Sequence, residues 1–316
     1  MEYICKTPVA LIFFNRPRTF EKVFAEVKKV KPTKLFLIQD GARNDADKEK
    51  ISKCREIAES VDWECDIVRD YSDVNLGCGM RPQSGITNAF KTVDRLIILE
   101  DDCVPCQSFF RYADECLEKY KDDERICYIS GLNHFEQWDS AGSDYFFTKT
   151  GAIWGWATWK RAWDKYDYHV KAIEDENAIK LAKQRITNKY IANQREKAWL
   201  RAYNSAESGE KLSYWDIQWG FVKYYYDMLV IVPKFNQISN IGEGVGSTHA
   251  QNSKTGKYKK YKNFFYIPTK ELDNPIKHPK EVVCDEKYDQ LVYKVSAGNP
   301  IKRFVVRIVK KIMKKK

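Results

Sequence analysis

Three consecutive acidic residues, Glu100, Asp101 and Asp102, follow the apolar run 96–99. A short, continuous apolar run is typical of a buried strand, so the acids are predicted to lie at a strand's end. Adjacent carboxylates repel one another unless a cation or solvent compensates their charge. Hard oxygen ligands favour Mg²⁺ or Mn²⁺, and these ions commonly complete their coordination with substrate phosphates. The triplet is therefore interpreted as a site for a divalent metal and a diphosphate; the simpler alternative is a solvated acidic turn.

Strand and helix signals alternate through the first 130 residues, as expected for a sheet with helices on both faces. The predicted strands are 9–14, 35–38, 66–68, 96–99 and 126–129, and the predicted helices are 20–30, 45–60, 86–93 and 108–120. Polar residues follow three of these strands, at Asn15, Asp40 and Asp101. Open α/β sheets bind ligands along the edge where strands end, so these residues are expected to share a site.

Aromatic residues dominate the second half of the chain. Eight of the nine tryptophans lie between Trp138 and Trp219, and this half is predicted to build the surface for a second substrate. The charged stretch 175–208 interrupts the aromatic blocks and is interpreted as a solvated, amphipathic helical excursion. We therefore divide the chain into two halves of one domain, 1–130 and 131–275, and a C-terminal extension, 276–316.

The net charge of +10 is concentrated in the last sixteen residues. Segment 301–316 holds eight basic residues and no acids, which leaves only +2 for the rest of the chain, so nucleic acid is not expected as a partner. Apolar residues in this segment recur at helical spacing, with basic residues between them, which predicts an amphipathic helix lying on an anionic membrane surface. A helix docked on the protein's own body is the alternative. Run 9–14 is too short to span a membrane and is interpreted as an internal strand.

The run 96–105 and the residues 109–112 resemble the strand, acidic triplet and helix of the GT-A glycosyltransferases. The resemblance is greatest to the N-acetylglucosaminyltransferase I family and to bacterial sugar transferases of polysaccharide loci. Further similar segments follow the same order between about residues 8 and 250, at 14–17, 39–41, 75–81, 154–156 and 215–216. The resemblance implies an α/β, Rossmann-like nucleotide-diphospho-sugar transferase fold with a mixed central sheet. To this fold the sequence adds the aromatic-rich acceptor half and the C-terminal amphipathic helix.

For the donor, the resemblance implies that Arg16 and Asp40 border the nucleotide, with Asp40 near the uracil or ribose. It also implies that Arg81 approaches the diphosphate. Arg16 as a surface charge and Asp40 as a turn former are the alternatives, because both residue types are common in loops.

Within the triplet, the resemblance implies that Asp102 is the direct ligand of Mn²⁺ or Mg²⁺, while Asp101 and Glu100 hold the ribose and the sugar. His249, in the glycine-rich segment 240–249, is a further candidate for the metal or the diphosphate, although a lone histidine is more often an ordinary surface residue.

For the acceptor, Asp216 resembles the catalytic base of the inverting enzymes. Such a carboxylate must reach the acceptor hydroxyl, which attacks better as its proton leaves. The alternative is that Asp216 caps the helix beginning near Ile217. Trp215 and Trp154 are the candidates for stacking on a sugar ring, although most aromatic clusters are simply core.

The predicted function is metal-dependent transfer of a hexosyl or N-acetylhexosaminyl group from a nucleotide diphosphate, UDP by preference, to a glycan hydroxyl. The basic segment makes a lipid-linked acceptor the expected partner, which places the protein in the cytoplasm at the inner face of the cell membrane, in capsule or O-antigen assembly. A retaining mechanism stays open. The two rival functions are a sugar nucleotidyltransferase and a non-catalytic, membrane-associated glycan-binding protein.

Overall fold

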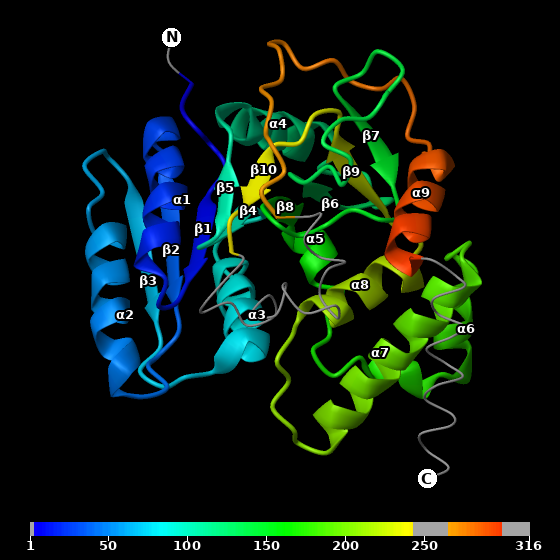
Figure 1. The fold of residues 1–316 in the computed structure, drawn as a ribbon, viewed down its shortest axis with the longest axis horizontal. Coiled ribbons are helices and arrows are strands. Elements are labelled where there is room, and N and C mark those ends of the chain that lie inside the picture. The colour runs from blue at the N-terminus through cyan, green and yellow to red at the C-terminus, as the bar shows by residue number, and fades with distance from the viewer. Residues whose placement is uncertain (1–2, 243–264, 299–316) are drawn as a thin grey trace.

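The computed structural model describes residues 3–242 and 265–298 (Figure 1). Strands and helices alternate in the first half of the chain, as the sequence predicts. The elements of this half are β1 (Val9–Phe13), α1 (Pro17–Val30), β2 (Lys34–Gln39), α2 (Asp45–Ala58), β3 (Asp66–Tyr71), α3 (Gly77–Ala89), β4 (Arg95–Glu100), β5 (Cys103–Pro105), α4 (Gln107–Lys119) and β6 (Ile126–Ser130).

The second half adds short strands and a group of helices. Its elements are β7 (Tyr145–Thr148), β8 (Trp156–Trp159), α5 (Lys160–Trp163), the 3₁₀ turn η1 (Lys171–Glu174), α6 (Glu176–Gln184), α7 (Lys189–Glu207), α8 (Asp216–Tyr225), β9 (Leu229–Pro233), β10 (Ile238–Asn240) and α9 (Glu286–Ala297). No helix of the described residues is long and apolar enough to cross a membrane.

Eight strands form one mixed sheet in the order β3-β2-β1-β4-β8-β6-β9-β7. Strands β3, β2, β1 and β4 are parallel, whereas β8 runs antiparallel to both β4 and β6. Strand β9 is parallel to β6, and β7 is antiparallel to β9. The predicted α/β class with a mixed central sheet is therefore confirmed. A separate antiparallel pair, β5 with β10, lies directly after the acidic triplet.

The central strands are buried on both faces because successive side chains point to opposite sides. In β1, Val9, Leu11 and Phe13 join the hydrophobic core beneath α1 and α4, whereas Ala10 and Ile12 join the core beneath α3, α5 and α8. All five residues are buried. The continuous apolar runs of the sequence thus become the middle layer between two layers of helices.

Two helix predictions were wrong in detail. Helix α3 spans Gly77–Ala89 and thus begins well before the predicted start at residue 86, because the residues from Gly77 onward are already helical. The stretch 175–208 is not a solvated excursion: α6 and α7 pack with α8 and α9 around a third core, in which Trp199 is fully buried. In Figure 1 this helical group lies at the lower right, beside the β7 end of the sheet.

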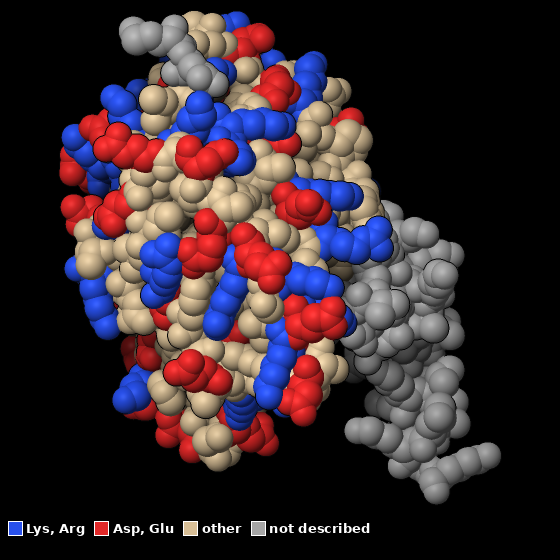
Figure 2. All heavy atoms as spheres, turned by 90° about the vertical axis from the view of Figure 1, so that its left-hand side faces the viewer, with Lys and Arg blue, Asp and Glu red and all other residues tan. Residues whose placement is uncertain are grey.

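Charges on the surface are of both signs. Figure 2 shows Lys and Arg intermingled with Asp and Glu on the side of the molecule that α2 occupies in Figure 1. Several of these side chains form exposed pairs, such as Lys53 with Glu49 on α2 and Arg69 with Glu59. Exposed pairs of this kind each contribute about 0–1 kcal/mol, so they balance the surface charge more than they stabilise the fold.

Candidate active site at the carboxyl ends of β1 and β4

The acidic triplet lies at the centre of the sheet. Glu100 ends β4, and Asp101 and Asp102 form the turn that leads into β5. Asp101 and Asp102 are buried, with 3% and 8% of their surface exposed, and Glu100 is half-buried. Because β1 and β4 are parallel neighbours, the residues that follow β1 are brought to the same edge of the sheet.

Arg16, which follows β1, pairs with two of the three acids. Its Nη1 donates to Asp102 Oδ2 at 2.8 Å, and its Nη2 donates to Asp101 Oδ1. The backbone amide of Phe14 also donates to Asp101 Oδ2, at 3.3 Å. The predicted proximity of the two strand ends is therefore a feature of the structure, and one guanidinium faces three carboxylates.

Glu100 has no hydrogen-bond or ion-pair partner among the described residues. Burial, followed by the charges of Asp102 and Asp101, raises its pKa from 4.5 to about 8. Burial also raises the pKa of Asp101, although Arg16 opposes this effect. The site is thus short of positive charge, and an added cation would relieve the repulsion among the carboxylates.

The surroundings of Asp102 leave room only for small groups. The chain after β10 crosses the triplet, where the amide of Ile241 donates to the Asp102 carbonyl at 2.8 Å. Gly242 lies so near that a Cβ there would be 2.0 Å from Asp102 Oδ2. Within residues 3–242 and 265–298, no group of three or more His, Cys, Asp or Glu is arranged to hold a metal ion. A hard cation held at the triplet would have to take most of its ligands from phosphate and water, and metal binding there stays a prediction.

Asp40 is buried and ties the end of β2 to the start of α3. Its carboxylate accepts hydrogen bonds from the backbone amides of Leu76 and Gly77, both at 2.7 Å, and from Gly41 N and Asn75 Nδ2. Asp40 thus satisfies amides in the first turn of α3, which is the turn-forming alternative of the sequence prediction. Its predicted contact with the nucleotide stays a prediction.

Arg81 lies on α3 and is buried against the β2–β3 edge. Its Nε donates to the carbonyl of Gln39 at 3.1 Å, and its Nη2 pairs with Asp70 Oδ1 at 2.7 Å. The structure does not bring Arg81 into contact with the acidic triplet. Its predicted approach to the diphosphate therefore finds no support in these contacts.

Asp216 is the first residue of α8 and is exposed. The N-cap position of α8 is Trp215, one residue earlier, and no side-chain capping hydrogen bond is made there, so the alternative that Asp216 caps this helix is wrong. Its negative charge is one cause of the raised pKa of Glu100, although the two residues are far apart in sequence. The fold therefore brings the charge of Asp216 within electrostatic range of Glu100, and its role as the catalytic base stays a prediction.

Cys78, in the first turn of α3, is a site residue that the sequence interpretation missed. Its Sγ donates to the carbonyl of Ser213 at 3.0 Å. Burial, followed by the charges of Glu100, Asp40 and Asp216, raises the pKa of the thiol. Its position between Gly77 and Gly79 was the signal available, but the spacing alone could not show that the charges of three distant acids act on its thiol.

The segment before Asp216 packs directly on α3. A Cβ at Gly79 would lie 2.1 Å from the carbonyl oxygen of Leu212, so only glycine permits this approach. Lys211 Nζ also donates to the carbonyl of Asn75 at 2.7 Å. These contacts fix the position of Asp216 relative to the strand ends.

The two tryptophan candidates differ in exposure. Trp215 is 5% exposed and stacks on Trp156, with ring centroids 5.8 Å apart. The indole of Trp215 therefore packs within the hydrophobic core. This geometry does not support the prediction that Trp215 stacks on the acceptor. Trp154 is half-buried beside Phe265, with centroids 5.1 Å apart. His249 and segment 301–316 lie outside the described residues.

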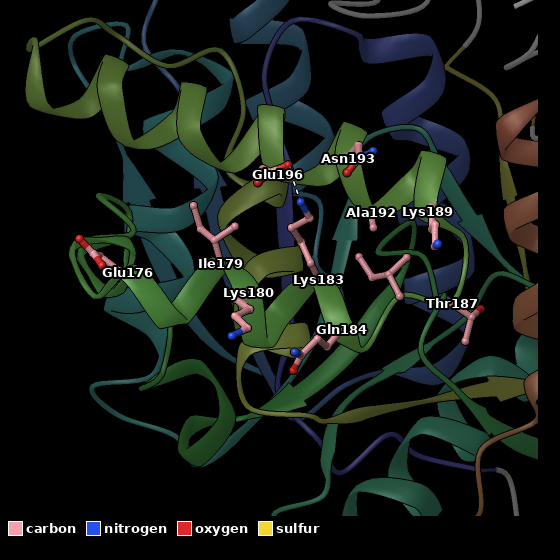
Figure 3. Close-up of a pocket in the computed structure, with 11 residues that line it drawn as sticks. Glu176, Ile179, Lys180, Lys183, Gln184, Thr187, Lys189, Ala192, Asn193 and Glu196 are labelled. Atoms are coloured by element: carbon pink, nitrogen blue, oxygen red, sulfur yellow. Dashed lines mark hydrogen bonds and ion pairs between the residues drawn. The ribbon is translucent and has the colours of Figure 1, made fainter.

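The structure forms two large hollows away from the triplet. One, of about 690 Å³, lies between α6 and α7, where Lys180, Lys183, Lys189 and Glu196 surround apolar residues such as Ile179 (Figure 3). The other, of about 750 Å³, lies at the amino-terminal ends of β1 and β4. Neither is lined by a residue of the triplet.

No family model and no curated protein sequence matches this chain. Among solved structures, the chain is similar to S. aureus TarS 1–349, with 9% identity and a TM-score of 0.40, over 74% of this chain and 59% of that one. It is also similar to a UDP-glucose pyrophosphorylase in complex with UDP-glucose, with 9% identity and a TM-score of 0.39, over 81% of this chain and 99% of that one. The chain thus spans less than two thirds of the TarS fragment. Both similarities are distant, and a function has to be inferred from the residues of the site.

Proposed function

We propose that this chain is a glycosyltransferase that moves a sugar from a nucleotide diphosphate, UDP by preference, to a hydroxyl of a glycan. One observation carries this proposal: the triplet at the carboxyl ends of β1 and β4 keeps more negative charge than Arg16 balances, while Asp216 lies within electrostatic reach of it. An unbalanced group of carboxylates at this edge suits a divalent cation with a diphosphate, and a separate carboxylate suits proton removal.

Each residue has one task in the proposed reaction. Asp102 would hold Mn²⁺ or Mg²⁺, Asp101 and Glu100 would orient the ribose and sugar, and Arg16 would donate hydrogen bonds to the diphosphate. The metal, when bound, supplies Lewis-acid stabilisation of the charge on the leaving diphosphate.

Asp216 would take the proton of the acceptor hydroxyl as its oxygen attacks the anomeric carbon. The bond between that carbon and the phosphate oxygen breaks at the same time, and its electrons leave on the diphosphate. Attack from the face opposite the leaving group inverts the anomeric configuration.

The acceptor is proposed to be lipid-linked, because segment 301–316 combines eight basic residues with apolar residues at helical spacing. This places the reaction at the cytoplasmic face of a membrane. A membrane-associated protein that binds glycans without reacting would share this segment, but it would have no need of an unbalanced carboxylate site.

Hydrolysis of UDP-sugars, measured with and without Mn²⁺, tests the function. Asp102→Asn should lower metal-dependent release by about 100-fold, the usual cost of removing a group that stabilises the transition state. Asp122→Asn, at an exposed position after α4, is the matched control and should behave as the wild type. Release that needs no metal, or that survives Asp102→Asn, would contradict the proposal. Consumption of nucleoside triphosphate with sugar phosphate would indicate a nucleotidyltransferase instead.

A further inference from the structure

Arg16 occupies the position for which a divalent cation would have to compete. Its Nη1 donates to Asp102 Oδ2 at 2.8 Å, and its Nη2 binds Asp101. The Arg16 side chain is 24% exposed, against 11% for Asp102 and 4% for Asp101. Within the described part of the chain, no other lysine or arginine forms an ion pair with the triplet. Asp102 Oδ2, the oxygen that would bind the metal, therefore already accepts a hydrogen bond from Arg16.

We propose that Arg16 is an internal counter-cation. It prevents free divalent metal from binding Asp102, and it gives up its hydrogen bond to Asp102 when a metal-bound diphosphate binds. This role rests on the proposed function and adds an order of binding to it. Metal and nucleotide would enter together, and Arg16 would move its hydrogen bonds from the carboxylates to the phosphates.

Like-charge repulsion explains why free metal is disfavoured. A bare divalent ion at Asp102 would lie beside the guanidinium, and the partly buried setting screens this repulsion poorly. The Gly242 backbone closes one side of Asp102 Oδ2, since even a Cβ would approach to 2.0 Å, so the ion cannot shift away on that side.

A diphosphate removes the conflict because its oxygens can bind both cations. Guanidinium groups bind phosphate through two parallel hydrogen bonds, so Arg16 would exchange two carboxylate contacts for two phosphate contacts. When the metal then binds the carboxylates, the guanidinium of Arg16 is paired with the phosphate.

Binding of Mn²⁺ without nucleotide, measured from the electron paramagnetic resonance signal of the free ion, tests this role. Arg16→Gln should bind Mn²⁺ about tenfold more tightly than the wild type, because one like charge leaves a partly buried site. Arg16→Lys should lie between the two, since an ammonium is a point charge that cannot bridge two carboxylates with a fixed fork. The double variant Arg16→Gln, Asp102→Asn should lose the gain in Mn²⁺ affinity, which would show that the ion binds at Asp102.

The same proteins are then titrated with UDP in saturating Mn²⁺. Arg16→Gln should lose UDP affinity about tenfold even though it binds the metal more tightly. If neither variant binds free Mn²⁺ more tightly, or if Arg16→Gln gains affinity for UDP as well, the counter-cation role is overturned. A wild type that does not bind UDP with Mn²⁺ would instead contradict the proposed function, and the free-metal comparison would still decide the role of Arg16. Thermal melting confirms that each variant is folded.

Discussion

Replacing Gly242 with alanine is the most direct structural test of the site. The new Cβ would lie 2.0 Å from Asp102 Oδ2 and 2.8 Å from Cγ. Non-bonded heavy atoms settle about 3.5 Å apart, so the carboxylate has to retreat by about 1.5 Å. The backbone cannot easily give way instead, because the amides of Ile241 and Gly242 donate to the Asp102 carbonyl and to Asn240 Oδ1, both at 2.8 Å.

A displacement of this size should be costly for activity and mild for stability. Misplacing a reacting or binding group by about 1 Å can lower a rate by about 100-fold. We therefore expect Gly242→Ala to lose about 100-fold in metal-dependent UDP-sugar hydrolysis and to bind UDP with Mn²⁺ more weakly. The fold should persist, because the clash is confined to one side chain at the edge of the sheet.

Gly220→Ala provides a matched control within the same chain. Gly220 lies inside α8, and a Cβ there would meet nothing within 4 Å. Alanine in a helix interior stabilises by about 0.5–1 kcal/mol relative to glycine, so this variant should melt higher and keep full activity. Calorimetric titration with UDP and Mn²⁺, together with thermal melting, compares the two. Normal UDP affinity in Gly242→Ala would refute the placement of the metal at Asp102.

Three other residues and one segment yield separate predictions. Because the pKa of Glu100 is raised from 4.5 to about 8 in the folded protein, the wild type in EDTA should lose stability as pH rises through this range and level off above it. Glu100→Gln should remove that loss, and identical melting curves against pH for both proteins would contradict it. Asp216→Asn should keep UDP affinity but lose at least about 100-fold in transfer to acceptor, the lower end of the range for a lost general base; full transfer would show that another group takes the proton. Asp40→Ala should destabilise the fold by about 3 kcal/mol in urea unfolding, because it leaves two part-buried amides at the start of α3 without an acceptor. Removal of 301–316 should release the protein from vesicles containing anionic lipid, and unchanged binding would exclude this segment as the anchor.

Five of the six strands of the first half and the position of the triplet could be predicted from the sequence alone, whereas the short strand β5 was missed. Continuous apolar runs such as that of β1 occur where a strand is buried on both faces, and this preference is local in sequence. The acids after β4 were predictable for the same reason, since the polar residues mark where the buried strand ends. The pairing of Arg16 with Asp101 and Asp102 was not predicted, because it depends on β1 and β4 being parallel neighbours in the sheet.

Only the tertiary structure decided what each polar or aromatic side chain contacts. Asp40 was predicted to contact the nucleotide, and in the structure its carboxylate accepts hydrogen bonds from backbone amides at the start of α3. Trp215 was predicted at the acceptor but is buried against Trp156, and Cys78 was overlooked although the charges of three acids help to raise the pKa of its thiol. The physical reason is that burial and pairing depend on which segments the sheet order brings together. A residue type restricts the chemistry that is possible at a position, and the partners supplied by distant parts of the chain determine which of those possibilities is used.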